Sequence, residues 1–169
     1  NEPVRLPVAL IGSADVQSLQ EFVAAAPMGG GITYVIVTPP LPEGDLSPLL
    51  RPHTALPLCP IDDQAVLQPD CIHILPPTRM IARFESPARV VTAPQTQPAP
   101  IDACFMLLAP LLGAYALGVL LGSAGEDGAL GLTHIHEAGG LAAVQEQRGA
   151  SVNALSGRAL AVEPVDLML

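Results

Sequence analysis

The sequence predicts an α/β domain, a doubly wound and mostly parallel sheet with helices on both faces and a short antiparallel hairpin. Apolar runs that end at glycine or proline alternate with segments whose apolar residues recur at helical spacing. The apolar runs are unbroken, as is typical of parallel strands that helices cover on both sides. A length of 169 residues fits one domain over residues 1–169.

The first half of the chain opens with a predicted β-α-β unit. Pro7–Gly12 is an apolar run that ends at glycine and predicts a buried strand. Asp15 supplies capping chemistry for a helix that follows. Ile32–Val37 predicts the second strand, which the prolines after Thr38 end, and a short helix is expected over Leu46–Arg51. The helix after Asp15 has four apolar residues at helical spacing, Val16, Leu19, Phe22 and Val23.

The middle of the chain predicts short strands between turns, and the second half returns to α/β alternation. Cys71–Leu75 is one candidate strand, Met80–Phe84 and Val90–Ala93 predict a hairpin, and Ala93–Pro100 is an exposed connection. The remaining expected elements are a helix over Ile101–Leu112, a strand over Ala116–Leu121, a helix from Asp127 to Ala138, a strand over Leu141–Val144, a helix over Asn153–Val162 and a closing strand over Val165–Leu169.

One stretch could be mistaken for a membrane span. No charged residue occurs from Ala103 to Gly125, a run long enough to cross a bilayer. A proline and three glycines interrupt this run, which favours a helix, a turn and a buried strand in place of one continuous helix. We predict no membrane span. The interrupting residues are Pro110, Gly113, Gly118 and Gly122.

The composition excludes several classes of protein. Half of the residues are hydrophobic, which rules out wholesale disorder. The chain has 7 arginines, no lysine and 16 acidic residues, giving a formal net charge of -9, so no nucleic-acid partner is expected. The three cysteines are widely spaced without a C-x-x-C motif, which predicts reduced, buried thiols and a cytoplasmic location. The start at Asn1 has no signal-peptide pattern and suggests a fragment of a longer protein.

Open parallel sheets bind ligands where the strands end at their carboxyl edge. Three predicted loops meet there, Gly12–Gln17, Thr38–Asp45 and Gly122–Gly128. A hydrolase would need a nucleophile, a base and an orienting acid in these loops. The loops supply acidic residues and the hydroxyl of Ser13, but they contain no histidine to act as the base.

Several segments are similar, in order, to the motifs of one enzyme family. Residues 119–132 match V-L-L-T-G-M-G-x-D-G-A-x-G-L, and Glu137–Gly140 match E-A-G-G. Ile11–Gln17 stand in the place of I-G-A-S-x-G-G, and Val37–Glu43 in the place of V-V-Q-H-L-P-P. Asp70–Pro77 stand where G-H-V-Y-I-A-P-P is common. Over nearly its full length the chain resembles the catalytic domain of the CheB family of chemotaxis receptor methylesterases and deamidases.

The resemblance implies the α/β fold and removal of methyl esters from receptor glutamates, but the reactive positions differ. Carried over residue by residue, the nucleophile position holds Ala14, the base position Pro40 and the oxyanion-assisting methionine position Ala124. Only the acid position is retained, as Asp127. Val16-Gln17 replace the glycine pair that follows the nucleophile. Loss of a nucleophile or base costs up to about a million-fold in turnover.

The leading hypothesis is therefore a degenerate methylesterase domain that acts as a binding or regulatory module in chemosensory signalling. Its expected partners are chemoreceptor signalling helices, another chemosensory protein or a second copy, with no cofactor and no metal. One alternative is an active methylesterase that uses Ser13 with a repositioned histidine, and another is a structural oligomerisation domain. The resemblance also implies an N-terminal receiver domain in the full-length protein, which is absent from this chain.

Each candidate residue also has a structural explanation. Ser13 is expected to hydrogen-bond the backbone of its own loop, and Asp127 to cap the helix that it opens. Glu43, Asp45, Glu126 and Asp127 form either a weak cation site or a solvated acidic rim.

The four histidines give little support to a catalytic base or a metal site. His134 and His136 are two residues apart on a predicted helix and do not share a face. His73 lies within an apolar strand, where a satisfied, half-buried ring is expected. His53 is expected at the surface near the second loop.

Overall fold

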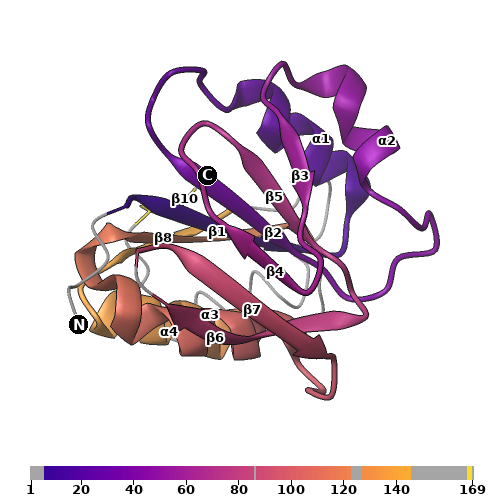
Figure 1. The fold of residues 1–169 in the computed structure, drawn as a ribbon. Coiled ribbons are helices and arrows are strands. Elements are labelled where there is room, and N and C mark those ends of the chain that lie inside the picture. Colours follow the sequence, from indigo (N-terminus) through magenta and orange to yellow (C-terminus); the bar gives the residue numbers. More distant parts are fainter. Residues whose placement is uncertain (1–5, 86, 123–126, 146–166, 169) are drawn as a thin grey trace, which may run out of the picture.

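The computed structural model describes residues 6–85, 87–122, 127–145 and 167–168, and every structural statement below concerns these residues. Seven strands form one sheet in the order β10-β9-β8-β1-β2-β5-β3, and every neighbouring pair is parallel (Figure 1). The predicted parallel sheet is thus confirmed. Its strands are β1 (Val8–Ser13), β2 (Thr33–Val37), β3 (Leu58–Pro60), β5 (Ile72–Leu75), β8 (Ala116–Leu121), β9 (Leu141–Val144) and β10 (Leu167–Met168).

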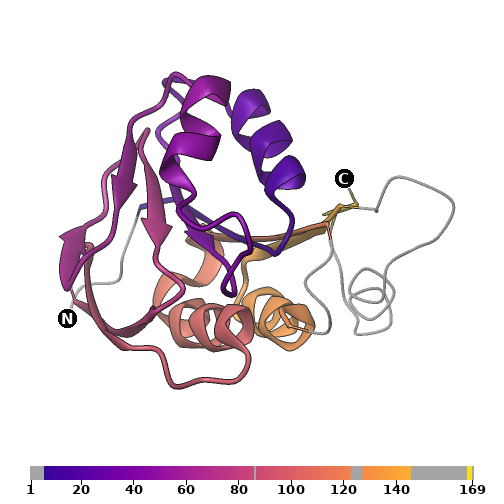
Figure 2. The same cartoon turned by 90° about the vertical axis from the view of Figure 1, so that its right-hand side faces the viewer.

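Helices cover both faces of this sheet. On one side lie α1 (Val16–Ala25) and α2 (Ser47–Leu50), the latter continued by the 3₁₀ turn η1 (Arg51–His53). On the other side lie α3 (Pro100–Leu112) and α4 (Ala129–Glu137) (Figure 2). A second 3₁₀ turn, η2 (Gly113–Tyr115), joins α3 to β8. The doubly wound arrangement predicted from the sequence is confirmed.

The sheet separates two apolar cores because successive side chains of a strand point to opposite faces. In β1, Ala9 and Ile11 pack with the core under α1, whereas Val8 and Leu10 pack with the core under α3. All six residues of β1 are buried. This burial on both faces explains why the central strands are apolar throughout, with no alternation of polar residues.

A small antiparallel sheet packs against the α3 side. Its strands are β4 (Gln64–Val66), β6 (Arg79–Glu85) and β7 (Arg89–Pro94), in the order β4-β7-β6. The hairpin of β6 and β7 confirms the predicted one. The strands β3 and β4 were not predicted, because three residues are too few to show a period.

Most element boundaries agree with the predictions to within two residues. The helix expected from Asp127 to Ala138 begins later, at Ala129, because Gly128 is its N-cap residue with a left-handed φ of 110°. The helix expected over Asn153–Val162 lies outside the described residues, as does most of the predicted closing strand. All three cysteines are free thiols. None of the described helices is both long and apolar enough to cross a membrane.

The helices α3 and α4 approach closely at Gly131. A Cβ atom added to Gly131 would lie 2.6 Å from the Cβ of Phe105 and 3.2 Å from the Cα of Asp102. Cβ contacts this short do not occur in folded proteins, so one helix would have to move. The absence of a side chain at Gly131 therefore sets the distance between these two helices.

We expect Gly131→Ala to lower the free energy of unfolding by about 1–2 kcal/mol, because overpacking outweighs the gain in helix propensity. Urea denaturation followed by circular dichroism measures this change. Gly30→Ala is the matched control, since a Cβ there would lie no closer than 3.7 Å to Pro27. A loss no larger in Gly131→Ala than in Gly30→Ala would contradict the close contact.

Candidate functional site

The segments that follow β8, β1 and β2 lie next to one another at the carboxyl edge of the sheet. β1 lies between the other two strands, with Gly12 paired with Val37 of β2 and Ser13 paired with Leu121 of β8. The points at which the three predicted loops begin therefore share one edge. Ala124 and Glu126 belong to the third loop but fall outside the described residues.

The side chain of Ser13 is buried and is bonded within its own loop. Its Oγ accepts a hydrogen bond from the backbone N–H of Asp15 at 3.0 Å and donates one to the Asp15 carbonyl at 3.3 Å. Ser13 is fully buried. Within the described part of the chain, its hydroxyl has no histidine partner.

Asp15 begins α1 and lies against the start of the third loop. Its Oδ2 accepts hydrogen bonds from the backbone N–H of Ser18 at 3.3 Å and from Ser18 Oγ at 2.5 Å. This is the predicted N-cap of α1. Gly122 packs on the same pair, since a Cβ there would lie 2.8 Å from Ser18 Oγ. The Asp15 carboxylate that caps α1 thus also lies against Gly122, the residue that follows β8.

Asp127 caps a helix, but the helix is α3 and not the one that follows it in sequence. Its Oδ2 accepts from the backbone N–H of Ile101 at 2.8 Å, and its Oδ1 accepts from the N–H of Asp102 at 2.7 Å. The prediction that Asp127 caps its own helix was therefore wrong. Pro100 has no N–H to offer, so these two amides are the first donors at the start of α3.

Asp102 provides the cap of α4 in return. Its Oδ1 accepts from the backbone N–H of Gly128 at 3.0 Å and of Gly131 at 2.7 Å. Asp102 lies in α3 and caps α4, whereas Asp127 lies just before α4 and caps α3. Sequence reasoning missed Asp102. The available signal was an acidic residue in the first turn of a helix, which does not reveal partners 26 and 29 residues away.

The surroundings of the Asp127 carboxyl change its affinity for a proton. Burial raises the pKa of Asp127, and the nearby charge of Asp102 raises it further. The hydrogen bonds from backbone amides act in the opposite direction, and the net shift is upward. An orienting acid in a catalytic triad holds a histidine, whereas the two oxygens of Asp127 each hold a backbone amide.

Pro40 lies at the mouth of a cavity where β2 and β5 end. The cavity has a volume of about 320 Å³, and no histidine lines it. Sequence reasoning placed Pro40 and Asp45 in this loop but did not find the cavity, since the rest of its lining comes from β3, from β5 and from the prolines after β5. The lining residues are Thr38, Pro40, Leu41, Gly44, Asp45, Leu46, Ser47, Pro60, Ile74, Leu75, Pro76 and Pro77.

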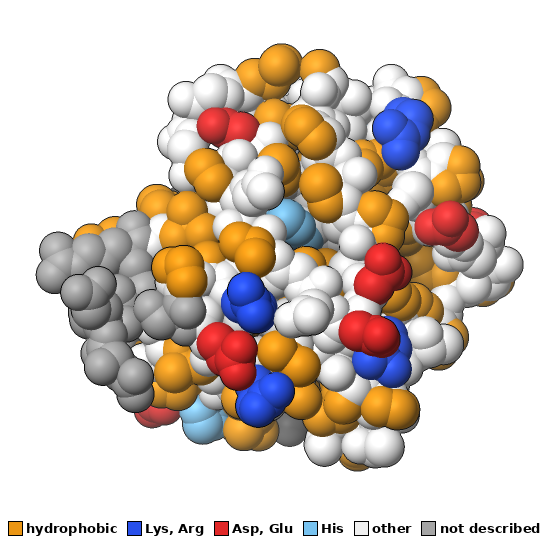
Figure 3. All heavy atoms as spheres, in the orientation of Figure 1, with side chains coloured by type: hydrophobic (Ala, Val, Ile, Leu, Met, Phe, Trp, Pro, Cys, Tyr) orange, Lys and Arg blue, Asp and Glu red, His pale blue; other side chains and the backbone are white. Residues whose placement is uncertain are grey.

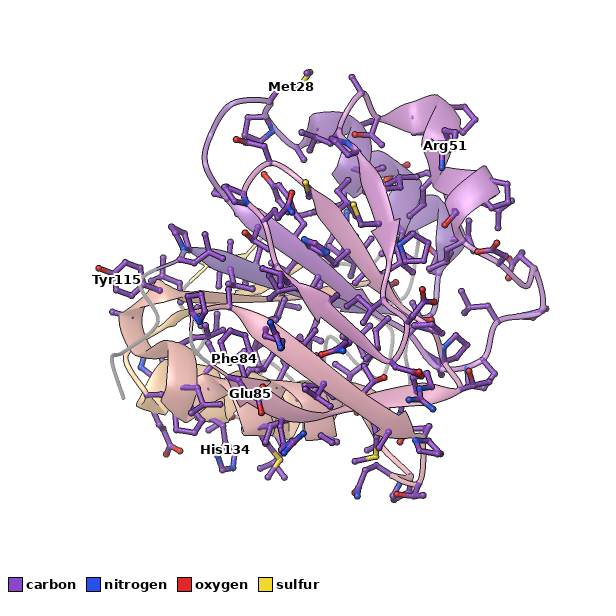
Figure 4. The ribbon with its side chains drawn as sticks, viewed as in Figure 1. Met28, Arg51, Phe84, Glu85, Tyr115 and His134 are labelled. Atoms are coloured by element: carbon purple, nitrogen blue, oxygen red, sulfur yellow. The ribbon has the colours of Figure 1, made fainter. Side chains whose placement is uncertain are left out.

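The described histidines do not complete a catalytic site. His53 is exposed on η1, as predicted. His73 is more buried than expected. Its Nε2 accepts from the backbone N–H of Gln68 at 3.1 Å, and burial lowers its pKa. His134 and His136 lie on α4. Figure 4 shows His134 on the far side of the sheet from α1. The described residues contain no group of three or more metal-ligating side chains.

The fold and this edge define a class: an α/β domain built like the catalytic domain of a bacterial methylesterase. The crystal structure of the Thermotoga maritima CheB methylesterase catalytic domain matches with a TM-score of 0.86 over 98% of this chain and 93% of that chain. The sequence identity is 18%, so this likeness concerns the fold. The sequence model of the CheB methylesterase family matches residues 8–169. The chain belongs to the CheB methylesterase family.

Curated relatives are moderately similar in sequence. The "Protein-glutamate methylesterase/protein-glutamine glutaminase 1" of Myxococcus xanthus is 36% identical over 109 residues, 61% of this chain and 32% of the relative. The corresponding protein 2 of Methanospirillum hungatei is 27% identical over 94% of this chain and 47% of its own length. An "Uncharacterized 104.1 kDa protein in hypE 3'region" of Rhodobacter capsulatus is 31% identical over 73% of this chain and 13% of its own length. The chain thus spans less than half the length of these relatives.

We expect Asp127→Asn to destabilise the fold by about 1–3 kcal/mol, because an asparagine can accept one of the two amide bonds and opposes the other with an NH₂ group. The pKa of Asp127 is higher in the folded state than in the unfolded state, so the folded wild type binds a proton more tightly. The resulting stabilisation is fully present below the unfolded-state pKa. It is lost as the pH rises through the folded-state pKa. The stability advantage of wild type over Asp127→Asn should therefore shrink with rising pH in that window.

Urea denaturation at several pH values between about 3 and 7 measures both effects. Asp62→Asn removes an exposed carboxylate and is the control, with an expected change within about 0.5 kcal/mol. An advantage that grew with pH would mean that the amide bonds outweigh burial at Asp127.

Proposed function

We propose that this chain is a single methylesterase-like domain that has lost its catalytic chemistry and acts as a binding or regulatory module in cytoplasmic chemosensory signalling. The observation that carries the proposal is the pairing of Asp127 with the start of α3. The acid that the family motif retains has a structural role here that needs neither nucleophile nor base.

The residues assigned to the other catalytic positions support the same proposal. Ala14 has no nucleophilic atom, and Pro40 has neither a proton acceptor nor a mobile side chain. The assignment of both positions, and of Ala124 to the oxyanion position, rests on the motif alignment. β1 and β2 are adjacent in the sheet, which puts Ala14 and Pro40 at the same edge, as an active site would require.

The alternative is an active methylesterase with Ser13 as the nucleophile. It would require the Ser13 hydroxyl to leave its two bonds with the Asp15 backbone and to reach solvent from a fully buried position. It would also require a histidine to approach this edge. His53 is the histidine that the sequence places nearest to the second loop, and its side chain is exposed on η1.

The partner expected first is a chemoreceptor signalling helix, the substrate of the family enzymes that the chain resembles. The relatives whose names specify this activity are longer proteins, so activity and partner are carried over as proposals. The large exposed apolar residues lie on separate elements and give no reason to prefer an oligomerisation domain. They are Met28, Val66, Leu111, Tyr115, Leu130 and Leu141.

Methanol release from methyl-esterified receptor helices tests the proposal. We expect the wild-type chain to release methanol no faster than buffer, and Ser13→Ala to behave identically, because the described residues contain no nucleophile–base pair. Calorimetry with the same helices should show saturable binding. A family methylesterase with intact motifs provides the positive control.

Turnover by the wild type that Ser13→Ala abolishes would establish the alternative mechanism. Turnover that survives Ser13→Ala would overturn both readings of the site. In that case the nucleophile would have to be sought at a position that the motif alignment does not indicate.

A further inference from the structure

Two cysteines lie on one face of neighbouring strands, at the β3 edge of the seven-stranded sheet. Cys59 belongs to β3 and is in register with His73 of β5. Cys71 directly precedes β5 and lies two residues before His73, so all three side chains project from the same face. Cys59 and Cys71 are therefore diagonal neighbours on adjacent strands.

The two thiols also interact with each other. Burial raises the pKa of the Cys71 thiol, and the charge of Cys59 and a hydrogen bond between the two thiols raise it further. Cys71 Sγ lies 4.0 Å from Gln68 Oε1, a long contact that holds the thiol only weakly. Both cysteines are free, so two reduced thiols lie side by side.

The two thiols differ in their access to solvent. Cys59 is partly exposed, whereas Cys71 is only 8% exposed. Oxidation begins at the accessible sulfur of such a pair, and the neighbouring thiol then resolves the oxidised form. The difference in exposure assigns the first role to Cys59 and the second to Cys71.

The charge of the molecule indicates which oxidants can approach. Figure 3 shows mostly hydrophobic and uncharged side chains over β3 and β5, in the upper part of the view. The formal net charge of -9 disfavours the approach of anionic oxidants. A small neutral oxidant such as a hydroperoxide meets no such barrier.

We propose that Cys59 and Cys71 form a reversible disulfide when the protein meets a hydroperoxide. Cys59, after losing its proton to water, attacks hydrogen peroxide, the O–O bond breaks, and a sulfenic acid forms while the departing hydroxide takes up the proton. The Cys71 thiol then attacks the Cys59 sulfur, which forms the S–S bond and releases a second water. The two thiols lose two electrons, and the peroxide is reduced to two waters. An added dithiol returns both cysteines to thiols by exchange.

The position of β3 allows the bond to form. A disulfide requires Cα atoms no more than about 7 Å apart, which is closer than diagonal neighbours on parallel strands usually lie. β3 has three residues and ends the sheet, with β5 as its neighbour on one side, so it can shift toward Cys71. The disulfide would hold β3 against β5, two strands that contribute Pro60 and Ile74 to the cavity at the carboxyl edge. This inference goes beyond the proposed function and does not depend on it.

The experiment treats the reduced wild-type chain with hydrogen peroxide and counts free thiols after denaturation in an alkylating agent. We expect the count to fall from three to one. Cleavage before aspartate residues then places Cys59 in the peptide 45–61 and Cys71 in the peptide 70–101. These peptides should stay linked until dithiothreitol is added, and dithiothreitol should restore three thiols in the intact chain.

Three variants test the separate roles. Cys71→Ser removes the resolving thiol, so we expect a sulfenic acid at Cys59 that dimedone traps. In Cys59→Ser, oxidation of Cys71 should be at least tenfold slower than in the wild type. Cys104→Ala is the matched control and should leave the link unchanged, since Cys104 is buried in α3, where burial raises its pKa to about 12.

Several results would overturn the proposal. They are a wild-type count that stays above one, a link that includes Cys104 or joins two chains on non-reducing electrophoresis, and oxidation of Cys71 that is as fast without Cys59 as with it. The wild-type link decides the matter if a variant fails to fold. Thiol counts do not depend on methanol release, so a failure of this inference and a failure of the proposed function are separate results.

Discussion

The reciprocal capping of α3 and α4 is the interaction on which the rest of this molecule depends. Helix starts leave backbone N–H groups without intrahelical partners, and here two starts meet near the carboxyl edge of the sheet. Asp127 satisfies two N–H groups of α3, and Asp102 satisfies two around the start of α4. The negative charges also lie at the positive ends of both helix dipoles. The layer that covers one face of the sheet is thereby fixed to the segment that follows β8.

Because Asp127 has this structural role, an aspartate at the acid position does not by itself indicate catalysis. We expect an aspartate at the acid position of the family motif wherever it caps α3, with or without a catalytic histidine beside it. The Asp127 carboxylate is partly buried, and each of its oxygens accepts a backbone amide of α3. Its two amide bonds fix the position of the carboxylate before any base is present. In the inactive domain that we propose, the capping pair would explain why Asp127 is retained.

The sequence was sufficient to predict the layers of the fold but not its long-range polar contacts. Strands such as β1 and β8 were predicted because burial on both faces makes them continuous apolar runs. β3 and β4 were missed because short edge strands carry no period. The start of α4 was predicted too early, because Asp127 caps α3 and not the helix that follows it in sequence. Asp102 and the cavity lined by Ser47 depend on residues far apart in sequence, which single-sequence patterns do not connect.

Proline at the base position has a consequence beyond the loss of a proton acceptor. A proline ring fixes its own backbone and restricts the residue before it, so a loop with consecutive prolines has few conformations to lose on binding. Pro40, Pro76 and Pro77 place such rings on two sides of the cavity, at the ends of neighbouring strands. A preformed cavity gains affinity because little ordering accompanies the entry of a ligand. Pro40, which the motif alignment puts at the base position, thus also favours recognition by shape at this edge of the sheet.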